Sequence, residues 1–125
     1  MTAPVWMNSV IGDFGRAAGI GGLALNERGA AVLRFENGAT LRLEYTGDEL
    51  VVAMTVPSAD IKRLLSFSHP KARYGLRVRV GVIPKTREAV IAVRLVERDV
   101  TLPHVSSAFE LLWKLAGETG GAAWA

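Results

Sequence analysis

The sequence contains no cysteine, and this absence excludes disulfide bridges, thiolate nucleophiles and cysteine metal ligands. A chain without cysteine suits a reducing compartment. Histidine is also scarce: only His69 and His104 are present, and neither has a histidine or carboxylate at metal-ligand spacing. We therefore expect no zinc site.

Motifs for catalysis and nucleotide binding are missing as well. No serine lies in a nucleophile elbow, and no P-loop is present. The glycines at positions 12 to 22 do not form a G-x-G-x-x-G motif between a strand and a helix. The acidic residues fall on expected turns and outward strand faces, where carboxylates are simply solvated. The sequence predicts a protein that is not an enzyme and uses no cofactor.

Long hydrophobic runs are absent too. The longest uncharged candidates, around Ala17–Asn26 and Leu50–Ala59, are half of the roughly 20 residues that a membrane span needs. The amino-terminal sequence MTAPVWMNS lacks the basic region and apolar core of a secretion signal. We expect a single cytoplasmic domain over residues 1–125, without a membrane partner.

Apolar residues are nevertheless abundant. They make up 50% of the 125 residues, and the mean hydropathy is +0.24, which is high for a small monomer. A domain of this size buries about two-thirds of its unfolded surface. The excess apolar surface predicts that a partner polypeptide covers part of the molecule.

The clearest structural pattern lies between residues 31 and 56. Apolar and polar residues alternate there in three runs separated by two turns, which predicts a three-strand antiparallel meander. A three-residue loop at 36–38 places Leu33 opposite Leu41 and Gly38 in the left-handed conformation that such a loop requires. This register keeps one face of the sheet apolar.

At the second turn of the meander, the sequence predicts a two-residue loop at 47–48, which places Tyr45 opposite Leu50.

Upstream of the meander, Leu23 and Leu25 alternate with small residues, and this pattern predicts a short edge strand. Such a strand exposes unpaired backbone groups.

Helical periodicity marks both ends of the chain. An amino-terminal helix is expected after Pro4, with Trp6 and Phe14 as core anchors and Gly19 just past its end. A carboxy-terminal helix is expected to start near Thr101 and to end at the glycines from position 117. Its predicted buried residues are Val105, Ala108, Phe109, Leu112 and Ala116.

Between these ends the sequence predicts a short helix and a hairpin. The helix carries an apolar stripe and stops near Phe67, because Pro70 disfavours helical geometry before it. In the hairpin, residues 76–82 alternate between apolar and arginine-rich sides. Residues 90–96 are apolar on both sides except for Arg94, which predicts a strand covered on both faces.

Together these elements predict an α+β fold. An antiparallel sheet, made of the meander, the hairpin and a short edge strand, packs against three helices in the order α-β-β-β-β-α-β-β-α.

Positive charge is concentrated in one part of the chain. The formal net charge is +3, but residues 61–98 hold ten lysines and arginines against two glutamates. This segment is either a solvated basic face or the footprint of an acidic partner or nucleic acid. A small basic nucleic-acid-binding or regulatory module is the alternative function, although only Tyr74 is available for base stacking. Its candidate residues are Arg73, Arg77, Arg79, Lys85, Arg87 and Arg94.

The run FGRAAGIGGLALNERGAAVLRFENGATLRLE resembles the amino-terminal part of class I type III secretion chaperones. The likeness continues through the expected central helix, the hairpin and the carboxy-terminal helix. It implies a small, cytoplasmic, bacterial dimer that binds the extended amino-terminal segment of a secreted effector or secretion regulator. That segment stays export-competent without ATP. Extended segments of this kind add to a sheet edge and place alternate side chains in apolar pockets.

The resemblance also implies site residues. It places effector binding in a hydrophobic groove formed by Phe14, Ile20, Leu23, Leu25 and Phe35. It places the dimer interface on Ile61, Leu64, Leu65, Leu76, Val78 and Val80.

The charge departs from the family pattern. Class I chaperones are typically acidic, whereas the sequence pI here is about 9.7. Arg77 and Arg79 would repel across a symmetric dimer interface unless acids pair with them. A homodimer, a heterodimer with an acidic chaperone subunit and an acidic client all remain open.

Overall fold

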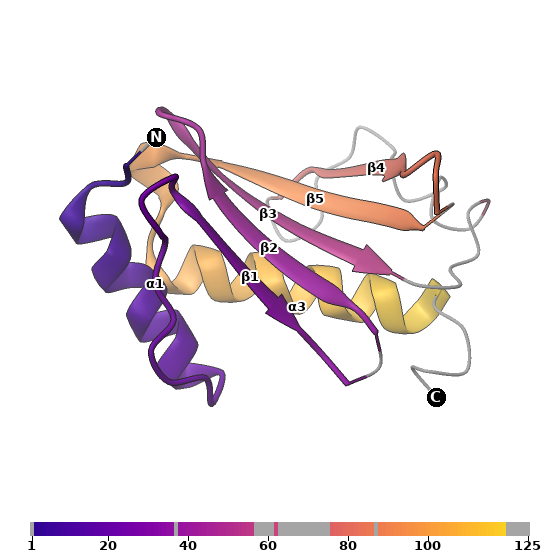
Figure 1. The fold of residues 1–125 in the computed structure, drawn as a ribbon, viewed down its shortest axis with the longest axis horizontal. Coiled ribbons are helices and arrows are strands. Elements are labelled where there is room, and N and C mark those ends of the chain that lie inside the picture. The colour runs from indigo at the N-terminus through magenta and orange to yellow at the C-terminus, as the bar shows by residue number, and fades with distance from the viewer. Residues whose placement is uncertain (1, 37, 57–61, 63–75, 87, 120–125) are drawn as a thin grey trace.

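A five-stranded antiparallel sheet with two helices on one face forms the part of the chain that the computed structural model describes, namely residues 2–36, 38–56, 62, 76–86 and 88–119 (Figure 1). The strand order is β1-β2-β3-β5-β4. The strands are β1 (Ala30–Arg34), β2 (Thr40–Tyr45), β3 (Glu49–Val56), β4 (Val78–Val82) and β5 (Ala89–Val96). The helices are α1 (Val5–Ala17) and α3 (Leu102–Thr119), and a 3-10 turn, η1 (Glu97–Asp99), precedes α3.

The meander has the predicted register. Leu33 lies opposite Leu41 in the β1–β2 pair, and Tyr45 lies opposite Leu50 in the β2–β3 pair. Gly38 has a φ of 88° and Gly47 a φ of 109°, conformations that residues with a Cβ rarely adopt. Local turn chemistry and the alternation of apolar residues therefore determine this part of the fold.

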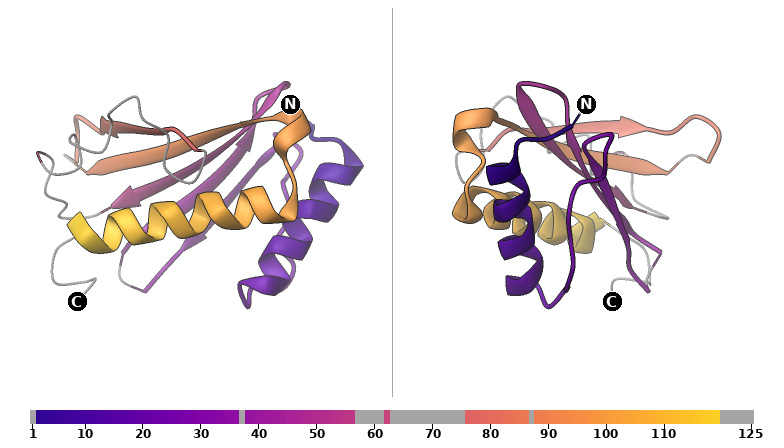
Figure 2. Two further views of the ribbon diagram at one scale, coloured as in Figure 1. Left: turned by 180° about the vertical axis from the view of Figure 1, so that it is seen from behind. Right: turned by 60° about the vertical axis from the view of Figure 1, so that its left-hand side comes forward.

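The predicted hairpin is formed by β4 and β5, but one expectation about β5 is wrong. Helix α3 covers the side of β5 that carries Ile91 and Val93, both buried. On the other side Val90 and Ala92 are only half-buried and Val96 is exposed, and no helix in the described ranges covers them (Figures 1 and 2). The strand is apolar on both sides, although the described helices cover only one of them.

The segment between α1 and β1 is not the short edge strand that was predicted. Residues 23–26 have no strand pairing, yet Leu23 and Leu25 are buried. The side-chain oxygen of Asn8 accepts a hydrogen bond from the Leu25 N–H at 2.9 Å, so α1 supplies the partner that a sheet would have supplied. The edge strand on this side of the described sheet is β1.

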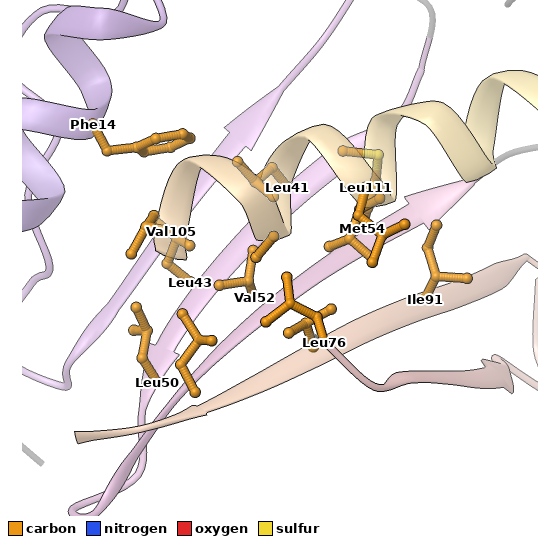
Figure 3. Packing of buried hydrophobic residues seen from close by; sticks show 14 of the residues in the cluster. Phe14, Leu41, Leu43, Leu50, Val52, Met54, Leu76, Ile91, Val105 and Leu111 are labelled. Atoms are coloured by element: carbon orange, nitrogen blue, oxygen red, sulfur yellow. The ribbon is translucent and has the colours of Figure 1, made fainter. Parts of the chain in front are cut away.

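The core lies between the sheet and α3, with α1 packed beside α3 at one end (Figures 2 and 3). Met7, Ile11 and Phe14 of α1 are buried as predicted. The prediction of Trp6 as a core anchor is wrong. This residue is 44% exposed, because it lies on the side of α1 that faces away from the core.

Helix α3 buries four of its five predicted core residues, and Phe109 is half-buried. Leu111 and Leu115 are buried in addition. The helix passes through Gly117 and extends to Thr119, so the first of the predicted terminating glycines does not end it.

The predicted central helix lies outside the described residues, apart from Lys62, which is helical. The described helices are α1 and α3, so the helix count is smaller than expected while the α+β class is confirmed. No described helix is long and apolar enough to cross a membrane.

Candidate functional site

Alternate backbone groups of β1 point outward, away from the sheet. The Phe35 N–H donates to the Ala39 carbonyl at 2.9 Å, and the Tyr45 N–H donates to the Gly29 carbonyl at 2.7 Å. In an antiparallel pair, alternate residues hydrogen-bond to the neighbouring strand. The backbone groups of Ala31 and Leu33 therefore face β2, and those of Ala30, Val32 and Arg34 face away from the sheet.

Asn26 closes one end of this edge. Its N–H donates to the Ala30 carbonyl at 2.8 Å, and its side-chain oxygen accepts the Ala30 N–H at 3.1 Å. The outward groups of Val32 and Arg34 have no such partner among the described residues. Strand addition at this edge is thus limited to the stretch that follows Ala30.

An aromatic cluster lies beside the other end of β1, where Phe35 follows Arg34. We use this name for Phe14 of α1, Phe35 after β1, and Phe109 and Trp113 of α3. The ring centroids of Phe14 and Phe109 are 5.5 Å apart, and those of Phe35 and Trp113 are 5.0 Å apart. Phe109 also lies 6.3 Å from Phe35 and 5.8 Å from Trp113. The cluster connects three separate elements.

A hollow of about 170 Å³ lies between α1 and α3 beside this cluster. The rings of Phe14 and Phe109 form its apolar side, and Ala17 and Ala18 leave room because their side chains are small. Ser106 and Glu110 complete its lining. The hollow can accept an apolar side chain and has polar groups at its margin.

The five residues predicted for the hydrophobic groove fall into two groups. Phe14 and Phe35 are brought together through Phe109. Leu23 and Leu25 are buried, and Ile20 is half-buried against the core. Effector binding by these residues stays a prediction.

Phe109 and Trp113 were not predicted as site residues. They are four positions apart on α3, so they lie on the same side of the helix. Trp113 keeps 37% of its surface exposed, which makes it the accessible member of the cluster. Their spacing was visible in the sequence, but the orientation of α3 toward β1 was not.

The predicted dimer residues are only partly described. Ile61, Leu64 and Leu65 lie outside the described residues. Leu76 and Val78 are buried in the core of this chain, and Val80 is half-buried against it. The dimer interface stays a prediction.

The described ionisable groups near the site do not meet the requirements of a metal centre. No group of three or more histidine, aspartate or glutamate side chains that could hold a metal ion occurs within the described ranges. His104 is exposed, and its Nδ1 lies 2.8 Å from the Thr101 hydroxyl at the start of α3. The contacts that the described residues offer at this site are backbone hydrogen bonds at the β1 edge and apolar contacts at the aromatic cluster.

Comparison with known proteins gives a match to one family. The family model described as type III secretory system chaperone SycN matches residues 6–119. A comparison with curated protein sequences gives no match.

Solved structures share the fold at low sequence identity. The structure described as the ExsC–ExsE complex is 21% identical, with a TM-score of 0.73 over 93% of this chain and 92% of that one. The HopA1–SchA chaperone–effector complex is 18% identical, with a TM-score of 0.70 over 91% and 92%. The type III secretion chaperone SycH of Yersinia pestis, in complex with a stable fragment of YscM2, is 17% identical, with a TM-score of 0.70 over 91% and 99%.

Proposed function

Because the chain belongs to the SycN family of type III secretory system chaperones, we propose that it binds an extended segment of a secreted protein along the outer edge of β1. The observation that supports this proposal is that the outward backbone groups of Val32 and Arg34 have no partner among the residues that the structure describes. An added strand can pair with both residues. The bound segment is the amino-terminal part of an effector or secretion regulator, and binding takes place in the bacterial cytoplasm before export.

The alternation of β1 defines what the added segment presents. Leu33 and Phe35 face the helices, whereas Val32 and Arg34 face the opposite side of the sheet. Side chains of the added strand alternate in the same way. Apolar side chains on the helix side reach the aromatic cluster, and polar or acidic side chains on the other side lie near Arg34.

The proposed action is non-catalytic and needs no ATP. Each backbone hydrogen bond to the edge contributes about 0.5–1.5 kcal/mol, and burial of apolar side chains against Phe35 and Trp113 adds to it. The ordering of a disordered segment costs much of this energy, so binding stays reversible. A reversible complex keeps the segment extended and available for release.

Substitution of one edge residue by proline tests the proposal. Val32→Pro removes the outward N–H while the hydrogen bonds to β2 from its neighbours remain. Val32→Thr is the matched control, because threonine keeps the outward N–H and a β-branched side chain at the same position. Val32 is 49% exposed, so neither substitution alters the core.

The client is first identified by co-purification from the native host followed by mass spectrometry, and its affinity is then measured for each variant. We expect Val32→Pro to weaken binding by roughly tenfold, the equivalent of one or two lost hydrogen bonds. We expect Val32→Thr to bind as the wild type does. Equal affinity of Val32→Pro and the wild type would exclude strand addition at β1.

We also propose that the chaperone acts as a dimer through β4, which carries Val78 and Val80 of the predicted interface and follows Leu76. The supporting observation is that β4 forms the second edge of the sheet, with Val82 exposed. Light scattering on the purified chain measures the mass directly. A monomeric mass at working concentration would contradict a homodimer and leave a heterodimer to be tested with an acidic partner subunit.

A further inference from the structure

The face of the sheet opposite α3 combines small side chains with arginines. We call it the open face; it is the side toward the viewer in Figure 1. Its centre, on β3 and β5, carries only small or β-branched side chains, all half-buried: Val51, Ala53, Thr55, Val90 and Ala92. These residues form a shallow apolar strip along the strands.

Arginines border this strip on both sides. Strand pairing places Arg42 opposite Ala53, Ala53 opposite Ala92, and Ala92 opposite Arg79. One row across the sheet therefore runs from an arginine over two alanines to another arginine. Extension of the register places Arg77 opposite Arg94.

The positive charge of the open face is only partly compensated. Glu44 lies 3.3 Å from Arg42, and Glu49 lies 3.5 Å from Arg94. Arg34, Arg77 and Arg79 are exposed and have no acidic partner among the described residues. Like charges on neighbouring strands repel each other, so an external anionic group would stabilise the Arg77–Arg94 pairing.

The spacing of the two arginine borders matches a helix. Three inter-strand steps separate β2 from β4, which amounts to about 14 Å. An α-helix with its side chains is about 10–12 Å wide. A helix lying on the strip would contact the alanines with small or apolar residues, and carboxylates on its two flanks would reach the arginines.

From this arrangement we propose that the open face docks an acidic amphipathic helix of a partner protein. This surface lies on the other side of the sheet from the aromatic cluster and does not depend on strand addition at β1. Single-stranded nucleic acid fits it less well, because no described aromatic residue lies on this face for base stacking.

The probe is a synthetic helical peptide of about five turns, with alanine along one side and glutamate on both flanks of that side. A second peptide of the same sequence carries glutamine in place of every glutamate. Both are titrated into the isotope-labelled full chain, and backbone amide shifts are followed by NMR. We expect the glutamate peptide to shift the amides of β3 and β5, and the glutamine peptide to leave them unchanged.

Charge-matched variants locate the site. Arg77→Gln combined with Arg79→Gln should raise the dissociation constant on the order of tenfold, since two exposed ion pairs are lost. Arg16→Gln combined with Arg98→Gln removes the same charge from exposed positions on α1 and η1 and should leave the dissociation constant unchanged. Thermal melts of both double variants check that the fold is retained.

Equal binding of the two peptides would overturn the proposal, and so would amide shifts confined to α1, α3 or the β1 edge. An equal loss of affinity in both double variants would also contradict it. Tighter binding of a single-stranded oligonucleotide to the same amides would contradict it as well. Shifts on the open face that depend on protein concentration without peptide would instead assign it to a second copy of this chain. A loss of client binding in Val32→Pro with peptide binding intact would show that the two surfaces act separately.

Discussion

The side-chain oxygen of Asn8 lies 2.9 Å from the backbone nitrogen of Leu25 and accepts its hydrogen bond. One residue of α1 thereby replaces the strand partner that the segment before β1 lacks. The contact attaches this segment to α1 next to the β1 edge, so it supports the position of the site as well as the fold.

Asn8→Ala should destabilise the chain by about 1–2 kcal/mol, because the partly buried Leu25 N–H is left without its acceptor. Urea unfolding followed by circular dichroism measures the change. Ser9→Ala is the control: the Ser9 hydroxyl donates to the Val5 carbonyl at 3.4 Å on the exposed side of the same helix. Its effect should stay within about 0.5 kcal/mol. Equal effects of the two substitutions would contradict the role assigned to Asn8.

Gly15→Ala should also be destabilising, by about 1–3 kcal/mol. A Cβ at position 15 would lie 2.7 Å from the Leu23 Cβ and 2.8 Å from the Ile20 carbonyl oxygen. The same segment is held there by a hydrogen bond from the Ile20 N–H to the Gly15 carbonyl. The substitution forces it away from α1.

Gly12→Ala provides the matched control in the same helix. A Cβ there meets only ordinary contacts, at 3.6 Å from Arg16 and 3.8 Å from Leu23. This variant should be more stable than the wild type by about 0.5–1 kcal/mol, because alanine favours helix. Opposite signs for the two glycine variants in the same denaturation series are the expected result.

Local rules were sufficient for the meander and insufficient for the segment before it. The register of β1 to β3 follows from alternation and from glycines that need a positive φ, all within about 25 residues. The segment with Leu23 and Leu25 shows the same alternation, yet its hydrogen-bond partner is Asn8, seventeen positions away. A sequence pattern indicates which side chains are buried but not whether a strand or a helix buries them.

The same limit applies to both binding surfaces. Phe14 and Phe35 were predicted from the family resemblance, whereas Phe109 and Trp113 join them only because α3 passes beside the end of β1. Likewise, alternation places Arg77 and Arg79 on one side of their strand. Their position across the strip from Arg42 depends on the insertion of β5 between β3 and β4.

Stability at alkaline pH should depend on Tyr45. Burial raises the pKa of its phenol above the ordinary 10.0, and the charges of Glu97 and Asp48 raise it further. The hydroxyl also donates to the Gly47 carbonyl at 2.8 Å. Above pH 10 the unfolded chain loses this proton while the folded chain keeps it, so the free energy of unfolding falls until the raised pKa is reached.

Denaturation at a series of pH values from 8 to about 12 measures this dependence. Tyr45→Phe should be less stable than the wild type at neutral pH, since the hydrogen bond to Gly47 is lost, but its stability should decline less between pH 10 and the raised pKa. Tyr74 is retained in both proteins, so the difference between the two curves reports on Tyr45. Parallel curves would contradict the raised pKa.

Two exposed tryptophans allow a comparison of the aromatic cluster with the rest of the surface. Trp113 is 37% exposed and contacts Phe35 and Phe109 through its ring, whereas Trp6 is 44% exposed and is not part of the cluster. Trp113→Leu should lower the free energy of unfolding by about 1–2 kcal/mol, because two aromatic contacts are lost. Trp6→Leu should change it by no more than about 0.5 kcal/mol.

The same pair of variants separates stability from binding. If the bound segment places apolar side chains against the cluster, Trp113→Leu weakens client binding severalfold at a temperature where both variants remain folded, and Trp6→Leu does not. Trp113→Phe should restore most of the affinity, since an aromatic face is retained. Rescue by phenylalanine assigns the loss of affinity to the ring contact. A purely structural role for Trp113 would lower the free energy of unfolding without lowering the affinity for the client. Equal affinities for the wild type and Trp113→Leu would place the client's apolar side chains elsewhere on the molecule.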